Sequence, residues 1–317
     1  MSYAQFSLID ATDFNTLVGG NPTSTANTLN ATWATGSGTA GYGQTAVANV
    51  AAGQSIAASS QWAALVSNTA SAATHQGSSI TSVSTPVSGG TITFVSAIPT
   101  NLSTIYTSRL NAATQGATSA NTATFGSTWS QVLTFTHTAT FASGDAARYF
   151  FNSGGQLKIT CSHPPGIGIN LLFSNLASNV GTIVLSAPTS GTVSIAGTSY
   201  NGITKIGSDG NAPTIDSTKG YYGLTTANAT VFTQTASTGP SGYLSTFIRV
   251  IVKSNGTQGS NGDAGSVITV YTIWDEVPDG LVVSSGSATT LTAAAPETTN
   301  IANTWGAITL SGTVSGV

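Results

Sequence analysis

Residues 131–161 read QVLTFTHTATFASGDAARYFFNSGGQLKITC, and this run contains the signals of two strands with a helix between them. In its first part, threonines alternate with a second set of residues, which is Leu133, Phe135, His137, Ala139 and Phe141. Successive side chains of a strand point to opposite faces, so this alternation predicts a half-buried β-strand. In the last part, Leu157, Ile159 and Cys161 alternate with polar residues, which predicts a second strand.

The middle of the run predicts a helix of about two turns that joins the two strands. Ser143 or Gly144 would cap its N-terminus, and Asp145 would complement the positive end of the helix dipole. Arg148 lies three residues later and would pair with Asp145 on the helix surface. Gly154-Gly155 would supply a left-handed exit. We interpret these charges as parts of a structural joint, with a catalytic site as the alternative; the joint residues are Asp145, Arg148, Tyr149, Phe150, Phe151, Asn152, Gly154 and Gly155.

Downstream of this run, short β-rich segments alternate with turn signals such as Ser254-Asn255-Gly256 and Asp279-Gly280. The segments predicted as strands are QLKITCS, NLLFSNL, GTIVLSA, TVSIAG, ATVFTQTA, STFIRVIVKS, SVITVYTIWD and GLVVSS. Many short strands at this spacing predict an antiparallel β-sandwich, into which the short helix is inserted. We predict a mainly β protein whose sandwich domain covers residues 126–317.

The remaining residues, 1–125, predict an extended N-terminal region with two helices. The first helix covers 55–77 and has one apolar stripe, and Gly77 would end it. The second helix follows Pro99, with Thr100 or Asn101 as its cap. Both stripes are narrow, so the helices must pair with each other or with another chain. We predict that this region attaches the chain to sister subunits and does not fold alone; the residues assigned to attachment are Trp62, Leu65, Val66, Leu102, Ile105 and Tyr106.

Only 5% of the 317 residues are charged, and the formal net charge is −3. Ordinary globular domains contain roughly 25% charged residues. No charged residue lies between Asp13 and Arg109. A surface of threonine and serine suits large contacts between subunits, because burying a paired hydroxyl costs far less than burying a charge. This composition therefore predicts a subunit that is packed among other subunits.

The composition also argues against several classes of protein. The slightly negative charge argues against a nucleic-acid partner. No apolar run approaches the roughly 20 residues that span a bilayer, so no membrane insertion is expected. The opening MSYAQFSLID lacks the basic and apolar regions of a signal peptide, and the lone Cys161 excludes an intramolecular disulfide. Assembly in a cytoplasm is the expectation.

No arrangement of residues predicts catalysis, a cofactor or a metal site. His75, His137 and His163 have no metal-ligand spacing, and no P-loop, G-x-S-x-G or HExxH motif occurs. His137 is expected to be a hydrogen-bonded core residue, and Cys161 a small buried hydrophobe. The acidic cluster in WDEVPDG, at Asp275, Glu276 and Asp279, could bind calcium or cleave a glycan, but its spacing fits a turn better.

One loop could bind a sugar. Tyr221 and Tyr222 are flanked by glycines, with Lys219 beside them, and exposed aromatic rings can stack on carbohydrate. The alternative is that both tyrosines cover one end of the sandwich.

ARYFFNSGGQLKI at 147–159 resembles a motif of tailed-bacteriophage virion proteins, Ala-Arg-x-Phe-Phe-Asn-x-Gly-Gly followed by a strand. GYGQ at 41–44, SIAASSQWAALV and HQG at 75–77 resemble the region that precedes this motif, and 252–279 resemble a penultimate hairpin. The resemblance implies a non-enzymatic, multimeric component of the tail, neck or baseplate, located in the virion. Its partners would be sister subunits and other virion proteins. A fibre or adhesin that binds a host surface glycan is the alternative, and a depolymerase is a third.

Overall fold

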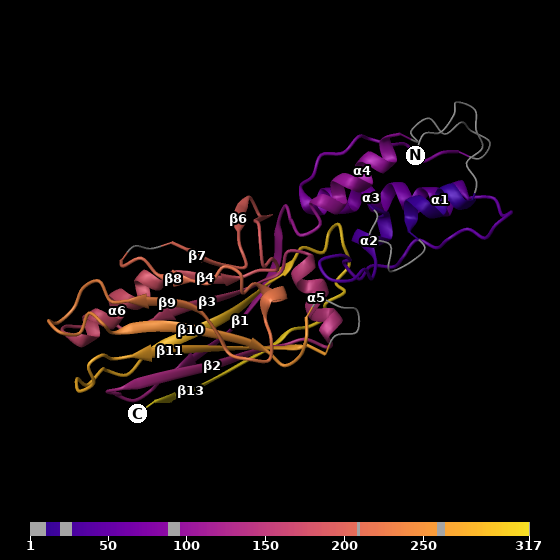
Figure 1. Cartoon of the computed structure of the whole chain (residues 1–317). Coiled ribbons are helices and arrows are strands. Elements are labelled where there is room, and N and C mark those ends of the chain that lie inside the picture. The colour runs from indigo at the N-terminus through magenta and orange to yellow at the C-terminus, as the bar shows by residue number, and fades with distance from the viewer. Residues whose placement is uncertain (1–10, 20–26, 88–95, 208–209, 259–263, 317) are drawn as a thin grey trace.

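The computed structural model describes residues 11–19, 27–87, 96–207, 210–258 and 264–316. A group of helices formed by the first part of the chain lies at one end of an elongated molecule, and a β-sandwich forms the rest (Figure 1). The protein is thus mainly β, and the predicted fold class is confirmed. A short helix is inserted between two strands of the sandwich, as the run 131–161 predicted.

The sandwich consists of two antiparallel sheets. The six-stranded sheet has the order β13-β2-β11-β10-β9-β8, and the five-stranded sheet has the order β1-β12-β3-β4-β7. The strands of the first sheet are β2 (Val132–Thr140), β8 (Thr214–Ile215), β9 (Ala229–Thr235), β10 (Phe247–Ser254), β11 (Val267–Asp275) and β13 (Thr309–Gly316). Those of the second are β1 (Gln115–Thr124), β3 (Gln156–Ser162), β4 (Thr182–Leu185), β7 (Ile203–Ile206) and β12 (Ala288–Pro296). A separate hairpin pairs β5 (Val193–Ile195) with β6 (Thr198–Tyr200).

Strand β2 is the centre of the predicted pattern, and its pairing explains the alternation. It lies between β11 and β13, with His137 opposite Val270 on one side and Gly312 on the other. Leu133, Phe135, His137 and Ala139 are buried between the sheets, as predicted, while the intervening threonines are only partly covered. The apolar row therefore forms the core and the hydroxyl row faces outward.

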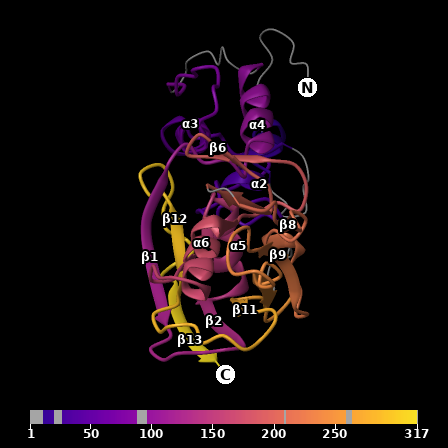
Figure 2. The same ribbon diagram turned by 90° about the vertical axis from the view of Figure 1, so that its left-hand side faces the viewer.

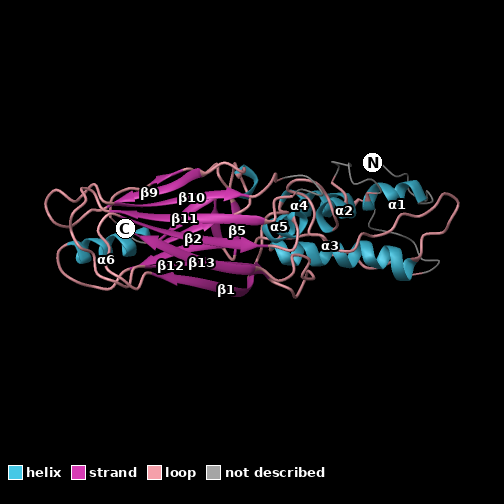
Figure 3. Cartoon of the chain, turned by 90° about the horizontal axis from the view of Figure 1, so that it is seen from below, coloured by secondary structure: helices cyan, strands magenta, loops and turns pink. Residues whose placement is uncertain are grey.

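Two helices interrupt the strands. Helix α5 (Gly144–Asn152) lies between the sandwich and the N-terminal helices (Figures 1 and 3). Helix α6 (Ile169–Val180) contacts strands of both sheets and lies between them in the view of Figure 2. The prediction of a strand at NLLFSNL was wrong, because these residues belong to α6. The spacing of Ile169, Leu172, Phe173 and Leu176 is helical, and all four side chains are buried.

The N-terminal helices pack on one another. They are α1 (Ala11–Val18), α2 (Leu29–Trp33), a π-helical turn η1 (Ala58–Trp62), α3 (Ala63–Gln76) and α4 (Ala97–Thr107). Gly77 ends α3 with φ +70°, as predicted. Helix α4 begins at Ala97 rather than after Pro99, so the predicted start was wrong. Pro99 is tolerated there because the first turn of a helix has no partners for its N–H groups.

The predicted boundary between residues 125 and 126 falls inside the sandwich. Strand β1 begins at Gln115, about ten residues before that boundary, and its residues 118–124 pair in unbroken register with β12. Strands β1, β6, β7, β8, β12 and β13 were not predicted. The segment GLVVSS forms no strand; within it, Val283 makes an isolated bridge with Trp129.

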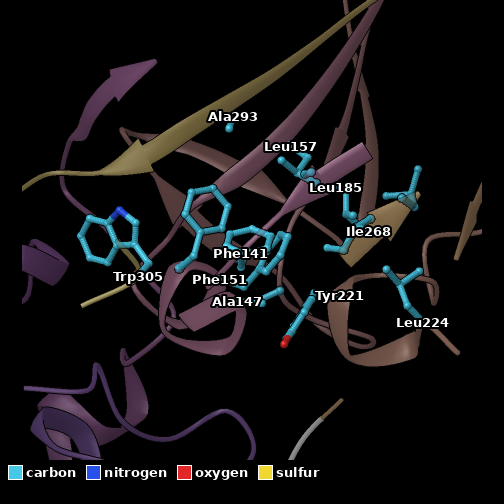
Figure 4. Packing of buried hydrophobic residues seen from close by; sticks show 14 of the residues in the cluster. Phe141, Ala147, Phe151, Leu157, Leu185, Tyr221, Leu224, Ile268, Ala293 and Trp305 are labelled. Carbon is cyan, nitrogen blue, oxygen red and sulfur yellow. The ribbon is translucent and has the colours of Figure 1, made fainter. Parts of the chain in front are cut away.

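The end of the sandwich nearest the N-terminal helices is filled by aromatic rings. The Phe151 ring of α5 stacks on the ring of Tyr221, with centroids 4.3 Å apart, and Phe141 lies against both Phe150 and Phe151. Figure 4 shows Phe141, Phe151 and Tyr221 side by side, with Trp305 nearby. Phe150 and Phe151 are completely buried, so α5 is part of the core of this end.

Candidate functional site

The most polar buried region of the chain lies where α5 meets the N-terminal region. We call it the seam, and its residues are Tyr42, Gln44, His75, Gln76, Arg148, Asn152, Tyr222 and Glu297. They come from the N-terminal region, from α5 and from two loops of the sandwich.

Arg148 is the centre of the seam. Its side chain is only 1% exposed, and its Nη2 donates to Asp145 Oδ1 at 3.1 Å. The predicted ion pair with Asp145 is therefore present, but on the buried side of α5 rather than on its surface. The guanidinium also donates to the backbone carbonyls of Thr35, Gly36 and Ala40. A planar group with five N–H donors suits this arrangement of fixed acceptors.

Asn152, one turn later on α5, binds the same loop. Its Nδ2 donates to the carbonyls of Gly38, Ala40 and Gly41 at 3.1–3.2 Å. The hydroxyl of Tyr222 donates to the Gly38 carbonyl and lies 2.6 Å from Asn152 Oδ1. The loop 35–41 is thus held almost entirely through its main-chain oxygens.

The sequence GYGQ at 41–44 continues this loop under α5. Gly43 has φ +72°, and a Cβ atom there would lie 2.5 Å from the ring of Tyr149. Only glycine fits both the backbone conformation and this close approach. Gln44 then bonds the backbone of Ala302 in both directions, at 2.8 and 3.0 Å. Tyr42 is completely buried, and its hydroxyl donates to the carbonyl of Arg109 at 2.8 Å.

The sequence HQG at 75–77 supplies the other side of the seam. His75 Nδ1 lies 2.8 Å from Glu297 Oε1, and both side chains are buried. Gln76 donates to the Tyr42 hydroxyl at 2.7 Å and to the carbonyl of Ile105 at 2.9 Å. The His75 and Tyr42 rings meet edge to face, with centroids 5.3 Å apart.

The electrostatics of the seam favour a neutral histidine beside an ionised carboxylate. Burial lowers the pKa of His75, although Glu297 partly offsets this effect. Burial also acts to raise the pKa of Glu297, but hydrogen bonds from His75, Asn300 and Thr299 outweigh it and leave that pKa lowered. His75 therefore donates its Nδ1–H to a carboxylate without being charged. Burial likewise raises the pKa of the Tyr42 phenol, which stays protonated.

This arrangement fastens the N-terminal region to the sandwich. Arg148 and Asn152 direct their donors at main-chain acceptors, and Gln44 and Gln76 bond groups of the chain itself. The residues predicted as a joint, Asp145, Arg148, Tyr149, Phe150, Phe151, Asn152, Gly154 and Gly155, lie on α5 and at its C-terminal exit, and their joint role stays a prediction. Gly154 has the predicted left-handed conformation, with φ +85°, and a Cβ atom there would lie 2.6 Å from that of Ala112.

Tyr221 and Tyr222 are not placed for sugar stacking. Tyr221 is completely buried against Phe151, and the Tyr222 hydroxyl is engaged by the seam. A buried ring offers no face to a ligand, so the prediction of a glycan-binding loop does not fit the structure. The alternative, that the tyrosines cover the end of the sandwich, does.

The residues assigned to attachment are mostly used inside the chain. Trp62, Leu65, Leu102 and Ile105 are at most 3% exposed, because α3 and α4 pack against each other and against α1 and α2. Val66 and Tyr106 are half-buried. The apolar stripes thus satisfy each other, and contact with another chain would require other residues.

The acidic turn, the cysteine and the core histidine that could have had a chemical role all contact other groups of the chain. Glu276 accepts hydrogen bonds from the N–H groups of Gly280 and Leu281, so it orders the WDEVPDG turn. Cys161 is only half-buried rather than buried as predicted; it packs against the core, and this partial burial raises the pKa of its thiol to about 12. His137 lies buried between the sheets as predicted, and burial lowers its pKa while backbone groups of Thr289 and Asn121 partly offset this. Neither ring nitrogen has a partner at hydrogen-bond geometry in the part of the chain that the structure describes, so the predicted hydrogen bond is not seen. In the described ranges, no group of three or more His, Cys, Asp or Glu residues is placed to hold a metal ion.

A cavity of about 340 Å³ lies between α3, α4 and residues 78–83. Its lining is neutral and includes Thr69, Ser78, Thr81 and Asn101, with Val66 and Ile98. No ionisable side chain reaches it, so it provides no acid or base. Among the described residues, no helix is both long and apolar enough to cross a membrane.

Comparison with known proteins found no match: no family model, no curated protein and no solved structure is significantly similar to this chain.

The cap of α5 gives a direct test of how much the helix contributes. Ser143 Oγ accepts a hydrogen bond from the Ala146 N–H at 3.1 Å, as one of the two predicted caps would. Ser143→Ala should lower the free energy of unfolding by about 0.5–2 kcal/mol, because it leaves that N–H without its acceptor. Urea denaturation measures the loss. Ser143→Asp should stay close to the parent, and equal stability of the alanine variant would contradict the assigned cap.

Proposed function

We propose that this chain is a non-enzymatic structural subunit of a tailed-phage virion, in the tail, neck or baseplate. One observation carries the proposal. The three segments that resemble virion proteins, GYGQ, HQG and ARYFFNSGG, are far apart in the sequence but meet at the seam. Segments of one shared architecture are expected to be in contact, and these hold the N-terminal helices to the sandwich.

The chemistry of the seam supports a structural role. Nearly all of its polar groups bond other groups of the same chain, and its one ion pair between fixed charges, Arg148 with Asp145, is used to hold a loop. An enzyme of this size would require a hollow site with titratable groups in reach of a substrate. The cavity between α3, α4 and residues 78–83 has a neutral lining.

The surface supports assembly with sister subunits and other virion proteins. With 5% charged residues, the chain has few charges to lose on contact with a partner. No observation favours a glycan-binding fibre, since Tyr221 is buried and Tyr222 is engaged by the seam. The sister-subunit contacts are proposed to lie outside the buried apolar stripes of α3 and α4.

The test is the protein content of the particle. Virions of the phage that encodes this chain should be purified, and their proteins identified by quantitative mass spectrometry. We expect the chain in several copies per particle, retained after a high-salt wash. Its absence from purified particles, with abundant chain in the infected-cell lysate, would contradict the proposal.

A further inference from the structure

The outer strands of the two sheets are protected very unequally. At one side, β7 has four residues and β8 has two, and β7 contains Lys205. Short edge strands and lysine are common ways in which proteins prevent a free edge from pairing with another chain. At the other side, β1 has ten residues and β13 has eight, and neither contains a charged residue or a proline.

Strand β1 is one of these two long edges, and β13 of the other sheet lies beside it. In the described part of the chain its hydrogen-bonded neighbour is β12 alone, and residues 117–120 are all exposed. Figure 2 shows β1 as the outermost ribbon on its side of the sandwich. Its irregularity is confined to 115–118, so residues 118–124 present a regular row of unpaired main-chain groups.

The outward side chains of β1 are suited to pairing with another threonine-rich strand. Thr122 of β1 and Thr290 of β12 share a hydroxyl hydrogen bond of 2.7 Å on the outer face. Thr138 of β2 and Ser311 of β13 do the same in the other sheet, also at 2.7 Å. Cross-strand hydroxyl pairs of this type stabilise adjacent strands. A strand that continued these hydroxyl pairs beyond β1 would be neutral and rich in threonine.

We propose that β1 pairs antiparallel with β1 of a second copy of this chain, joining the two five-stranded sheets across a twofold axis. The second copy supplies a strand of the same length and neutrality, with its own outward threonines at 118, 122 and 124. Twofold pairing places the same surface of each copy opposite the other. A charged strand from a different protein would find no opposite charge on β1, which has none. This inference deepens the proposed function, on which it rests, by naming the surface that joins sister subunits.

Introducing a charge of either sign at one exposed position of β1 tests the pairing. Ala120 is exposed near the centre of β1, so substitution there leaves the core intact. In a twofold pair, Ala120→Lys brings two lysines close together, and Ala120→Glu brings two glutamates. Each variant alone should dimerise at least about tenfold more weakly than the parent chain, as measured by sedimentation equilibrium. Mixing the two variants should restore a heterodimer.

The matched control carries the same charge on the opposite side of the sandwich. Thr214→Lys alters an exposed position of β8, the protected edge of the other sheet, and should leave dimerisation unchanged. Thermal melting of each variant checks that it remains folded. Ala120→Cys adds a crosslinking test, because the lone native thiol, Cys161, has a pKa of about 12 and reacts slowly. A short bis-maleimide should link two Ala120→Cys chains.

The outcomes separate this inference from the proposed function. A parent chain that stays monomeric at about 100 μM, or that dimerises equally well with lysine at position 120, would overturn pairing through β1. If the chain dimerised equally well with lysine at position 120, it would be a subunit that assembles through another surface. Failure to find the chain in purified particles would instead overturn the virion assignment, whatever the behaviour of β1.

Discussion

Replacing Arg148 with alanine is expected to lower the free energy of unfolding by about 3–5 kcal/mol, the range for removing one member of a buried ion pair. The loss has two sources. Asp145 loses its partner at 3.1 Å, and the carbonyls of Thr35, Gly36 and Ala40 lose their donors inside the protein. Each buried acceptor that is left unpaired adds to the loss. Urea denaturation monitored by circular dichroism measures the change.

Two companion variants show which part of Arg148 matters. Arg148→Lys keeps the charge but lacks the planar fork, so it should recover only part of the stability. Asp145→Asn should cost less than Arg148→Ala, because Asp145 is 26% exposed and the carbonyl contacts remain. If Arg148→Ala melted like the parent, the guanidinium would not be what holds the loop 35–41 to α5.

Acidification from pH 7.5 to 5.5 is expected to destabilise the chain strongly. Burial lowers the pKa of His75, of His137 and of His163 in the folded protein. Unfolding returns each to about 6.5, so below that pH the unfolded chain binds more protons than the folded one. The stability is fully present above about 6.5 and is lost as the pH falls toward the folded pKa values. Each of the three groups can contribute at most about 1.4 kcal/mol to the loss for each pH unit.

Carboxylates modify this dependence only at lower pH. Burial raises the pKa of Asp275 and of Glu276, so these groups take up protons first in the folded state and oppose the loss. Glu297, with its lowered pKa, adds to the loss as the pH falls below about 4.5. Unfolding free energies measured in steps between pH 7.5 and 5.5 therefore report chiefly on the histidines.

A substitution in the core separates the histidine contribution from other effects. His137→Phe places an apolar ring between the sheets and should reduce the pH slope, since one of the three shifted groups is removed. An unchanged stability from pH 7.5 to 5.5 in the parent chain would contradict the shifted histidines.

The elements that were predictable are those in which one face is buried and the other is not. Strand β2 alternates between core and hydroxyl row, and the sequence shows that period directly. Helix α5 could be predicted because its cap, its acidic first turn and its glycine exit are local signals. Helix α6 had a helical spacing at Ile169, Leu172, Phe173 and Leu176, but the short apolar run NLLF also resembles a buried strand.

The unpredicted elements lack such a contrast. Strand β1, QGATSANTAT, is an edge strand with most side chains exposed, so no apolar period marks it. The seam was unpredictable for another reason. Arg148 and Asn152 bind main-chain carbonyls of 35–41, which every sequence possesses, and only the glycines at 36, 38, 41 and 43 indicate an irregular path. No local pattern in the sequence marks Glu297 as part of the seam, because its partner His75 lies 222 positions earlier.

The seam also sets the order in which the parts of the chain can become complete during synthesis. Gln44 bonds Ala302, and Tyr42 bonds Thr304, across 258 and 262 positions. A ribosome adding roughly 5–20 residues per second needs tens of seconds to cover that span. The N-terminal helices leave the ribosome before α5, and the partners in the segment 297–304 follow only after most of the sandwich has been made. In that interval α3 and α4 can already pack on each other, but Tyr42, Gln44 and His75 lack their partners in the segment 297–304.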